Sequence, residues 1–166
     1  MSIALVGAPG AGKSTVGKRL ARKLGLTFVD VDNRIEQVVG KPIAEIFADE
    51  GEAHFRRIEE EATLELLESY DVVALGGGAV MNEAIQAALK GHEVIWLKVS
   101  IGQASRRVGL NTVRPLLLGN VRGRLIELLR ERTPVYEAIA TQVVETDGRG
   151  SSEVADELAR ERGWQQ

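Results

Sequence analysis

The stretch Gly7-Ala8-Pro9-Gly10-Ala11-Gly12-Lys13-Ser14 matches the phosphate-binding pattern G-x-x-x-x-G-K-[ST] at every fixed position. An apolar run, Ser2–Val6, precedes the stretch, and an apolar stripe of helical spacing follows it as far as Gly25. A strand, a glycine-rich loop and a helix in this order present free backbone N–H groups to a polyphosphate at the helix N-terminus, where the helix dipole favours anions. An accidental glycine-rich turn would lack this flanking context. The sequence therefore predicts a nucleoside triphosphate site.

The residue types within the loop suit this role. Gly10 and Gly12 carry no Cβ atom that would keep a phosphate away from the backbone. Lys13 is predicted to reach the β- and γ-phosphates of ATP, and the Ser14 hydroxyl to coordinate Mg²⁺. The predicted ATP-binding residues of the loop are Gly10, Ala11, Gly12, Lys13, Ser14 and Thr15.

Short apolar runs alternate with helical patterns along the rest of the chain. Five runs read as strands: Ser2–Val6, Thr27–Val31, Val72–Leu75, Val94–Val99 and Gln142–Glu145. Nearly continuous apolar strands are typical of parallel sheets covered on both faces. The predicted fold class is α/β, a doubly wound five-stranded parallel sheet with helices on both faces, like that of P-loop NTPases and nucleoside monophosphate kinases. We expect residues 1–166 to form one domain, with ligands at the carboxyl ends of the strands.

Composition restricts the classes of function. The chain has 166 residues, no cysteine and a formal net charge of −3. Disulfides and thiolate metal sites are therefore excluded, and a general nucleic-acid binder is disfavoured because it needs a basic face. The N-terminus shows no signal-peptide pattern, and no stretch approaches about 20 apolar residues. We expect a cytoplasmic monomer with neither nucleic acid nor membrane as a partner.

Two carboxylates, Asp30 and Asp32, lie at the end of the second predicted strand. Alternation along a strand would place both side chains on one face, facing the phosphate loop if this strand neighbours the first. One carboxylate could then hold water on Mg²⁺ while the other accepts a proton from an attacking hydroxyl. The alternative is that Asp32 only caps a helix beginning at Asn33, with Asp30 a solvated edge residue. Spacing alone leaves both alternatives open.

One segment, Gly109–Gly119, fits neither the strand nor the helix pattern. It is bounded by glycines, interrupted by Pro115 and long for a connection, so we predict a lid at about residues 109–119. Arg114 on this lid could swing onto the γ-phosphate and stabilise the transition state. The alternative is an ordinary solvated loop arginine.

Several segments resemble the shikimate kinase family, in the family's order and at about its spacings. Besides the phosphate loop and Asp30-Val31-Asp32, they are Phe55-Arg56-Arg57-Ile58-Glu59, Gly76-Gly77-Gly78-Ala79-Val80, Asn111-Thr112-Val113-Arg114-Pro115-Leu116-Leu117 and Arg132-Thr133-Pro134-Val135-Tyr136. The resemblance covers essentially the whole chain. It implies ATP-dependent phosphorylation of shikimate to shikimate 3-phosphate in aromatic amino acid (chorismate) biosynthesis, with Mg²⁺ as the cofactor.

The resemblance also implies roles for individual residues. It makes Asp32 a contact of the shikimate hydroxyls and the proposed base, and Asp30 a holder of Mg²⁺, through water. Lys13 and Arg114 complete the implied catalytic set, and Arg149 matches a residue near adenine, although the glycines beside it differ from the family. The implied shikimate-binding residues are Asp32, Arg56, Gly76, Gly77, Gly78 and Arg132.

Residue chemistry by itself allows some of these residues a different role. Arg56 and Arg57 each precede a glutamate by four residues, so both could form surface ion pairs; alternatively, Glu59 could orient Arg56. Gly76–Gly78 could be a flexible turn. Two rival functions remain: a P-loop kinase for another small acceptor, such as gluconate or a nucleoside monophosphate, and a nucleotide-binding switch without catalysis.

Overall fold

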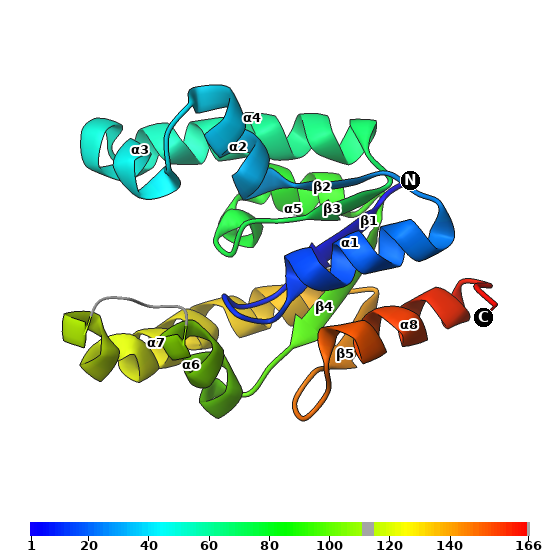
Figure 1. Ribbon diagram of the computed structural model, residues 1–166. Helices are drawn as coiled ribbons and strands as arrows, with labels where there is room; N and C mark the ends of the chain where they lie inside the picture. Colours follow the sequence, from blue (N-terminus) through cyan, green and yellow to red (C-terminus); the bar gives the residue numbers. More distant parts are fainter. Residues whose placement is uncertain (111–114, 166) are drawn as a thin grey trace.

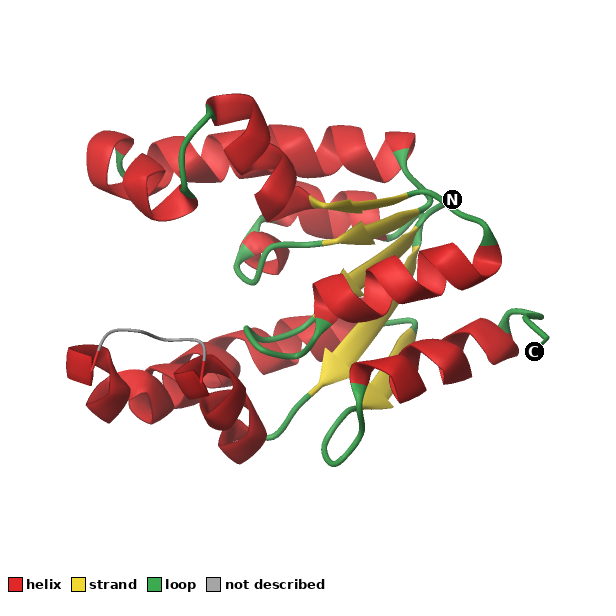
Figure 2. Ribbon diagram, in the orientation of Figure 1, coloured by secondary structure: helices red, strands yellow, loops and turns green. Residues whose placement is uncertain are grey.

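A computed structural model describes the backbone of residues 1–110 and 115–165 and the side chains of residues 1–106 and 123–165. Its centre is a five-stranded, fully parallel sheet with the strand order β2-β3-β1-β4-β5 (Figures 1 and 2). The strands are β1 Ile3–Val6, β2 Phe28–Asp30, β3 Val72–Ala74, β4 Glu93–Lys98 and β5 Gln142–Glu145. The predicted α/β class and parallel sheet are confirmed.

Helices connect successive strands and cover both faces of the sheet (Figure 1). They are α1 Lys13–Leu24, α2 Val31–Val39, α3 Ile43–Glu50, α4 Glu52–Ser69, α5 Glu83–Leu89, α6 Ile101–Leu110, α7 Pro115–Ile139 and α8 Ser151–Glu161, with a 3₁₀ turn at Ala79–Met81. Among the described helices, none combines the length and apolar character that crossing a bilayer requires.

The alternation of side chains along each strand divides the core into two layers. In β1, Leu5 packs with α1 and α8 on one face, while Val6 packs with α2, α4, α5 and α7 on the other. In β4, Leu97 lies in the same layer as Leu5, and Trp96 lies in the same layer as Val6. Because both faces are covered, the strands are apolar almost throughout, and polar groups collect at the strand ends.

The acidic pair was predicted to face the phosphate loop if the second strand lay beside the first. The strand order does not meet this condition. The strand beside β1 is β3, and β2 is an edge strand beyond it. The helix α7 runs from Pro115 to Ile139 and contains Pro134. Proline is tolerated at the first helical position, because its missing N–H is not needed there. The helix continues past Pro134 because the side chain of Tyr136 is fully buried in the core.

Part of the predicted lid lies outside the described residues. Residues 111–114, including Arg114, are not described, whereas 109–110 end α6 and 115–119 begin α7. The lid therefore stays a prediction.

Candidate active site

The phosphate loop joins β1 to α1 at the carboxyl end of the sheet. Gly10 and Gly12 have φ angles of 82° and 93°, a left-handed geometry that side chains disfavour. A Cβ atom on Gly7 would stand 2.7 Å from the carbonyl oxygen of Leu97. The glycines are therefore needed for both the turn and the close approach of β4, and the loop ends where the free N–H groups of α1 begin.

Lys13 bends back over the loop. Its Nζ donates hydrogen bonds to the carbonyl oxygens of Gly7, at 2.7 Å, and Ala8, at 3.3 Å. Burial lowers the pKa of Lys13 to about 8, and the nearby Arg132 cation acts in the same direction, while the carboxylates of Asp32 and Asp30 oppose them. An anionic phosphate would supply a further charge partner for this buried ammonium group.

Asp30 and Asp32 both line the hollow of the phosphate loop, but they stand at the start of α2 and not at alternate positions of a strand. Asp30 is the N-cap of α2, with its Oδ1 accepting a hydrogen bond from the Asn33 N–H at 3.0 Å, whereas Asp32 lies in the first turn of the helix. The alternative in which Asp32 is the cap is therefore wrong. Asp32 Oδ1 is buried and has no hydrogen-bond partner among the described residues. Burial raises the pKa of Asp32 to about 6, and repulsion from Asp30 and Glu59 adds to the rise.

Gly76–Gly78 follows β3 and is held close to charged side chains from distant segments. A Cβ on Gly76 would lie 2.8 Å from both Asp32 Oδ1 and Glu59 Oε2. On Gly78 it would lie 2.7 Å from Arg56 Nη1, and on Gly77 3.2 Å from Arg132 Nη1. This packing excludes the free, flexible turn that composition alone allowed.

Arg56 is oriented by a buried carboxylate. Its Nη1 donates to Glu59 Oε1 at 2.8 Å, and the Glu59 side chain is only 3% exposed. A second carboxylate, Glu52, lies 3.5 Å from Arg56 Nη2. The predicted orientation of Arg56 by Glu59 is confirmed, and these two carboxylates take the place of the expected surface partner, Glu60.

Two hollows meet at the glycine turn. The first, of about 350 Å³, contains the phosphate loop together with Asp30, Asp32, Leu75 and Gly77. The second, of about 470 Å³, is lined by Glu52, Arg56, Gly78, Met81, Asn82, Leu128, Glu131 and Arg132. Adjacent glycines thus border a cleft for phosphates on one side and a cleft with two arginines on the other.

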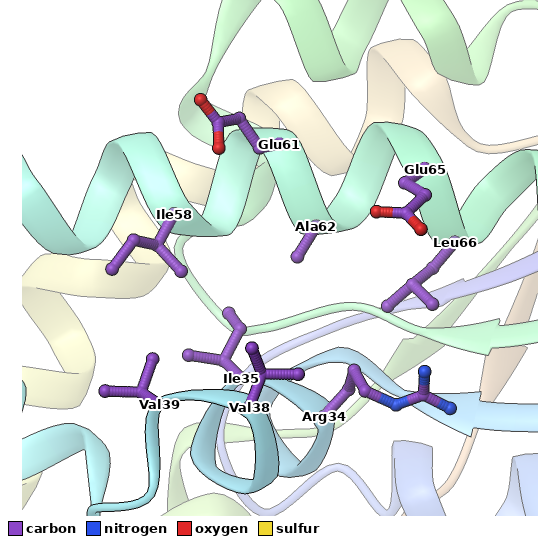
Figure 3. Close-up of a pocket in the computed structure, with 9 residues that line it drawn as sticks. All are labelled: Arg34, Ile35, Val38, Val39, Ile58, Glu61, Ala62, Glu65 and Leu66. Carbon is purple, nitrogen blue, oxygen red and sulfur yellow. The ribbon is translucent and has the colours of Figure 1, made fainter.

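A third hollow, of about 220 Å³, lies between α2 and α4 (Figure 3). Ile35, Val38 and Val39 face Ile58, Ala62 and Leu66 across it, and Arg34, Glu61 and Glu65 complete the lining. None of the predicted site residues that the structure describes lines this hollow, so the acceptor is better matched to the cleft beside Gly78.

Two predicted nucleotide contacts, Arg114 and Arg149, stay predictions. Arg114 lies outside the described residues. Arg149 precedes α8 and pairs with Glu153 and Glu157, and it is not among the residues that line the phosphate hollow. Its place near adenine stays a prediction.

Sequence reasoning gave Tyr136 no function. It lies one helical turn after Arg132, and its hydroxyl reaches the Gly77 carbonyl at 3.5 Å. Two signals were available: Tyr136 ends the Arg132–Tyr136 segment that resembles the family, and the spacing of four residues places both side chains on one face of α7.

The model of the family described as shikimate kinase matches residues 9–162. The chain belongs to the shikimate kinase family. The shikimate kinases of Thermobifida fusca and Salinispora arenicola are 50% and 53% identical to it; the aligned residues cover 95% and 93% of this chain, and 92% and 93% of those proteins. The predicted family and enzyme class are therefore confirmed.

Solved structures agree with this assignment. The structure of shikimate kinase from Acinetobacter baumannii in complex with shikimate superposes with a TM-score of 0.89 at 35% identity, covering 97% of this chain and 92% of that one. Shikimate kinase from Bacteroides thetaiotaomicron gives 0.85 at 31% identity, covering 98% and 97%.

Proposed function

We propose that the enzyme phosphorylates shikimate with ATP at the junction of its two hollows. ATP lies with its phosphates along Gly10–Thr15, and shikimate occupies the cleft beside Gly78. The observation that carries this arrangement is the approach of two guanidinium groups, Arg56 and Arg132, to the glycine turn that also borders the phosphate loop.

The acceptor cleft suits a hydroxylated carboxylic acid. An arginine fork donates two parallel hydrogen bonds to a planar carboxylate, and Arg56 is held for this role by Glu59. With the carboxylate at the arginines, the ring of shikimate extends along Gly76–Gly78 toward Asp32. The hydroxyl to be phosphorylated then lies between Asp32 and the phosphate loop.

The chain's own residues supply positioning and charge. Asp32 orients the attacking hydroxyl and accepts its proton, a role that suits a carboxylate with a raised pKa and an oxygen that finds no hydrogen-bond partner in the described part of the chain. Lys13 leaves its loop carbonyls to stabilise the charge on the transferred group. Arg114 adds to this charge stabilisation from the proposed lid, and Arg149 borders adenine.

The oxygen donors in the phosphate hollow fit Mg²⁺. The ion prefers oxygen ligands and keeps several waters, so it needs only one or two protein groups besides the substrate phosphates. Ser14 and Asp30 line the same hollow and would hold it, Asp30 through water. When bound, Mg²⁺ neutralises charge on the β- and γ-phosphates. We further propose a monomer that acts in the cytoplasm on small molecules alone.

A coupled assay of ADP release tests this function. With ATP and Mg²⁺, shikimate should accelerate ADP release, whereas gluconate, nucleoside monophosphates and no acceptor should not. Lys13→Ala should abolish the shikimate-dependent rate, and Arg132→Ala should raise the KM for shikimate far more than that for ATP. Binding of ATP without ADP release in response to any acceptor would instead favour the nucleotide-binding switch.

A further inference from the structure

Tyr136 stands at the boundary of the two hollows without lining either one. Its side chain is fully buried, and its hydroxyl donates a hydrogen bond to the Gly77 carbonyl at 3.5 Å. Gly77 borders the phosphate hollow, and Gly78, the next residue, borders the acceptor cleft. The hydroxyl therefore contacts the wall between the two substrate sites.

The same hydroxyl lies beside Arg132. The two residues are one turn apart on α7, and a Cβ atom on Gly77 would lie 3.2 Å from Arg132 Nη1. Burial raises the pKa of Tyr136, while the charge of Arg132 and a hydrogen bond from it oppose the rise. Since a phenol can accept one hydrogen bond and donate another, the hydroxyl can accept from the Arg132 guanidinium while it donates to the Gly77 carbonyl.

The turn of α7 between Arg132 and Tyr136 lacks one backbone N–H donor, the one that would bond the Arg130 carbonyl. Pro134 lies between Arg132 and Tyr136, and proline cannot donate the hydrogen bond of its helical position. The Tyr136 ring, by contrast, is held firmly by Trp96 of β4, with ring centroids 5.4 Å apart and planes inclined by 28°. The tyrosine thus links the turn that carries Arg132 to the rigid sheet.

We propose that Tyr136 is a positioning residue whose hydroxyl ties the Arg132 guanidinium to the Gly77 carbonyl and so sets where the acceptor carboxylate is held relative to the phosphate loop. The proposal rests on the carboxylate-binding role proposed for Arg132. It predicts that the hydroxyl affects shikimate binding through Arg132 alone.

A double-mutant cycle tests this coupling. Tyr136→Phe keeps the stacked ring and removes the hydroxyl, so it should raise the KM for shikimate by about three- to tenfold, the range of one net hydrogen bond. The KM for ATP and the melting temperature should stay near the wild-type values. In an Arg132→Ala background, the same change should alter the KM for shikimate by less than about twofold, because coupled residues are not additive.

An analogue of shikimate without the carboxylate charge distinguishes a positioning role of Tyr136 from a purely structural one. Shikimate methyl ester lacks the carboxylate charge. The ratio of the KM for the ester to the KM for shikimate should therefore fall by about three- to tenfold in Tyr136→Phe. Tyr70→Phe is the matched control. The Tyr70 hydroxyl accepts a hydrogen bond from Arg34 at the far end of α4, and its loss should change neither KM.

Three results would overturn the proposal. An effect of Tyr136→Phe that persists in the Arg132→Ala background would show action by another route. Equal rises in both KM values, with a lower melting temperature, would show a packing role. If Arg132→Ala itself leaves the KM for shikimate unchanged, the carboxylate role of Arg132 fails, and the inference fails with it.

Discussion

Replacing Gly76 with alanine should lower the turnover of the enzyme by disturbing two carboxylates at once. The added Cβ would lie 2.8 Å from Asp32 Oδ1 and 2.8 Å from Glu59 Oε2, whereas ordinary contact begins at 3.4 Å. Each carboxylate must therefore retreat by about 0.6 Å, the difference between these distances. The φ angle of Gly76 is not positive, so alanine introduces crowding without backbone strain.

The size of the effect follows from the need for alignment. A misplacement of about 1 Å in a reacting group can cost about a hundredfold in rate, so a shift of about 0.6 Å at Asp32 should lower kcat on the order of ten- to thirtyfold. Displacement of Glu59 should also loosen Arg56 and raise the KM for shikimate several-fold. Crowding in a packed site should lower the free energy of unfolding by about 1–3 kcal/mol.

Steady-state ADP release at varied shikimate and varied ATP separates these effects, and urea unfolding gives the stability. Gly91→Ala is the matched control, since its Cβ would meet only the Ala88 carbonyl oxygen at 3.7 Å, an ordinary contact distance. If Gly76→Ala kept the wild-type kcat and KM for shikimate, then neither carboxylate would need its present position. The assignment of Asp32 to the reacting hydroxyl would then be wrong.

Three further substitutions have definite expected outcomes. Asp32→Asn should lower kcat while nucleotide binding, measured by calorimetry, survives. Because the folded state raises the pKa of Asp32 to about 6, the ionised carboxylate destabilises the fold above that pH. The uncharged amide of Asp32→Asn should therefore increase the free energy of unfolding by on the order of 2–3 kcal/mol near pH 8. This gain should fade toward pH 4, as the folded protein takes up a proton on Asp32. Glu59→Gln should raise the KM for shikimate about tenfold through Arg56 and leave that for ATP unchanged; equal changes in both would contradict the orienting role. Gly17→Ala should destabilise the fold by about 1–3 kcal/mol in urea unfolding, even though alanine favours helices, because its Cβ would stand 2.6 Å from the Phe28 ring; a more stable variant would refute this packing.

Features decided by neighbouring residues were predicted well from sequence. The phosphate loop is one example, because its glycine positions, the following helix and the αL end of α1 at Gly25 all depend on residues within a few positions of one another. The five strands were predicted to within one or two residues, since nearly continuous apolar runs mark strands buried on both faces. The pairing of Arg56 with Glu59 follows similarly from a helical spacing of three residues.

Other features were settled only when distant segments packed together. Local pattern does not specify which strands pair, so β3 lies beside β1 although β2 comes first in the chain. Whether Asp30 or Asp32 caps α2 depends on where β2 ends, and pairing with β3 sets that end at Asp30. The approach of Asp32 and Glu59 to Gly76, and of Tyr136 to Gly77, joins residues up to 59 positions apart. Such contacts form because helices and strands bury their apolar faces on a common sheet. The hydrophobic effect is non-directional, so a short stretch of sequence does not specify which distant residues will meet.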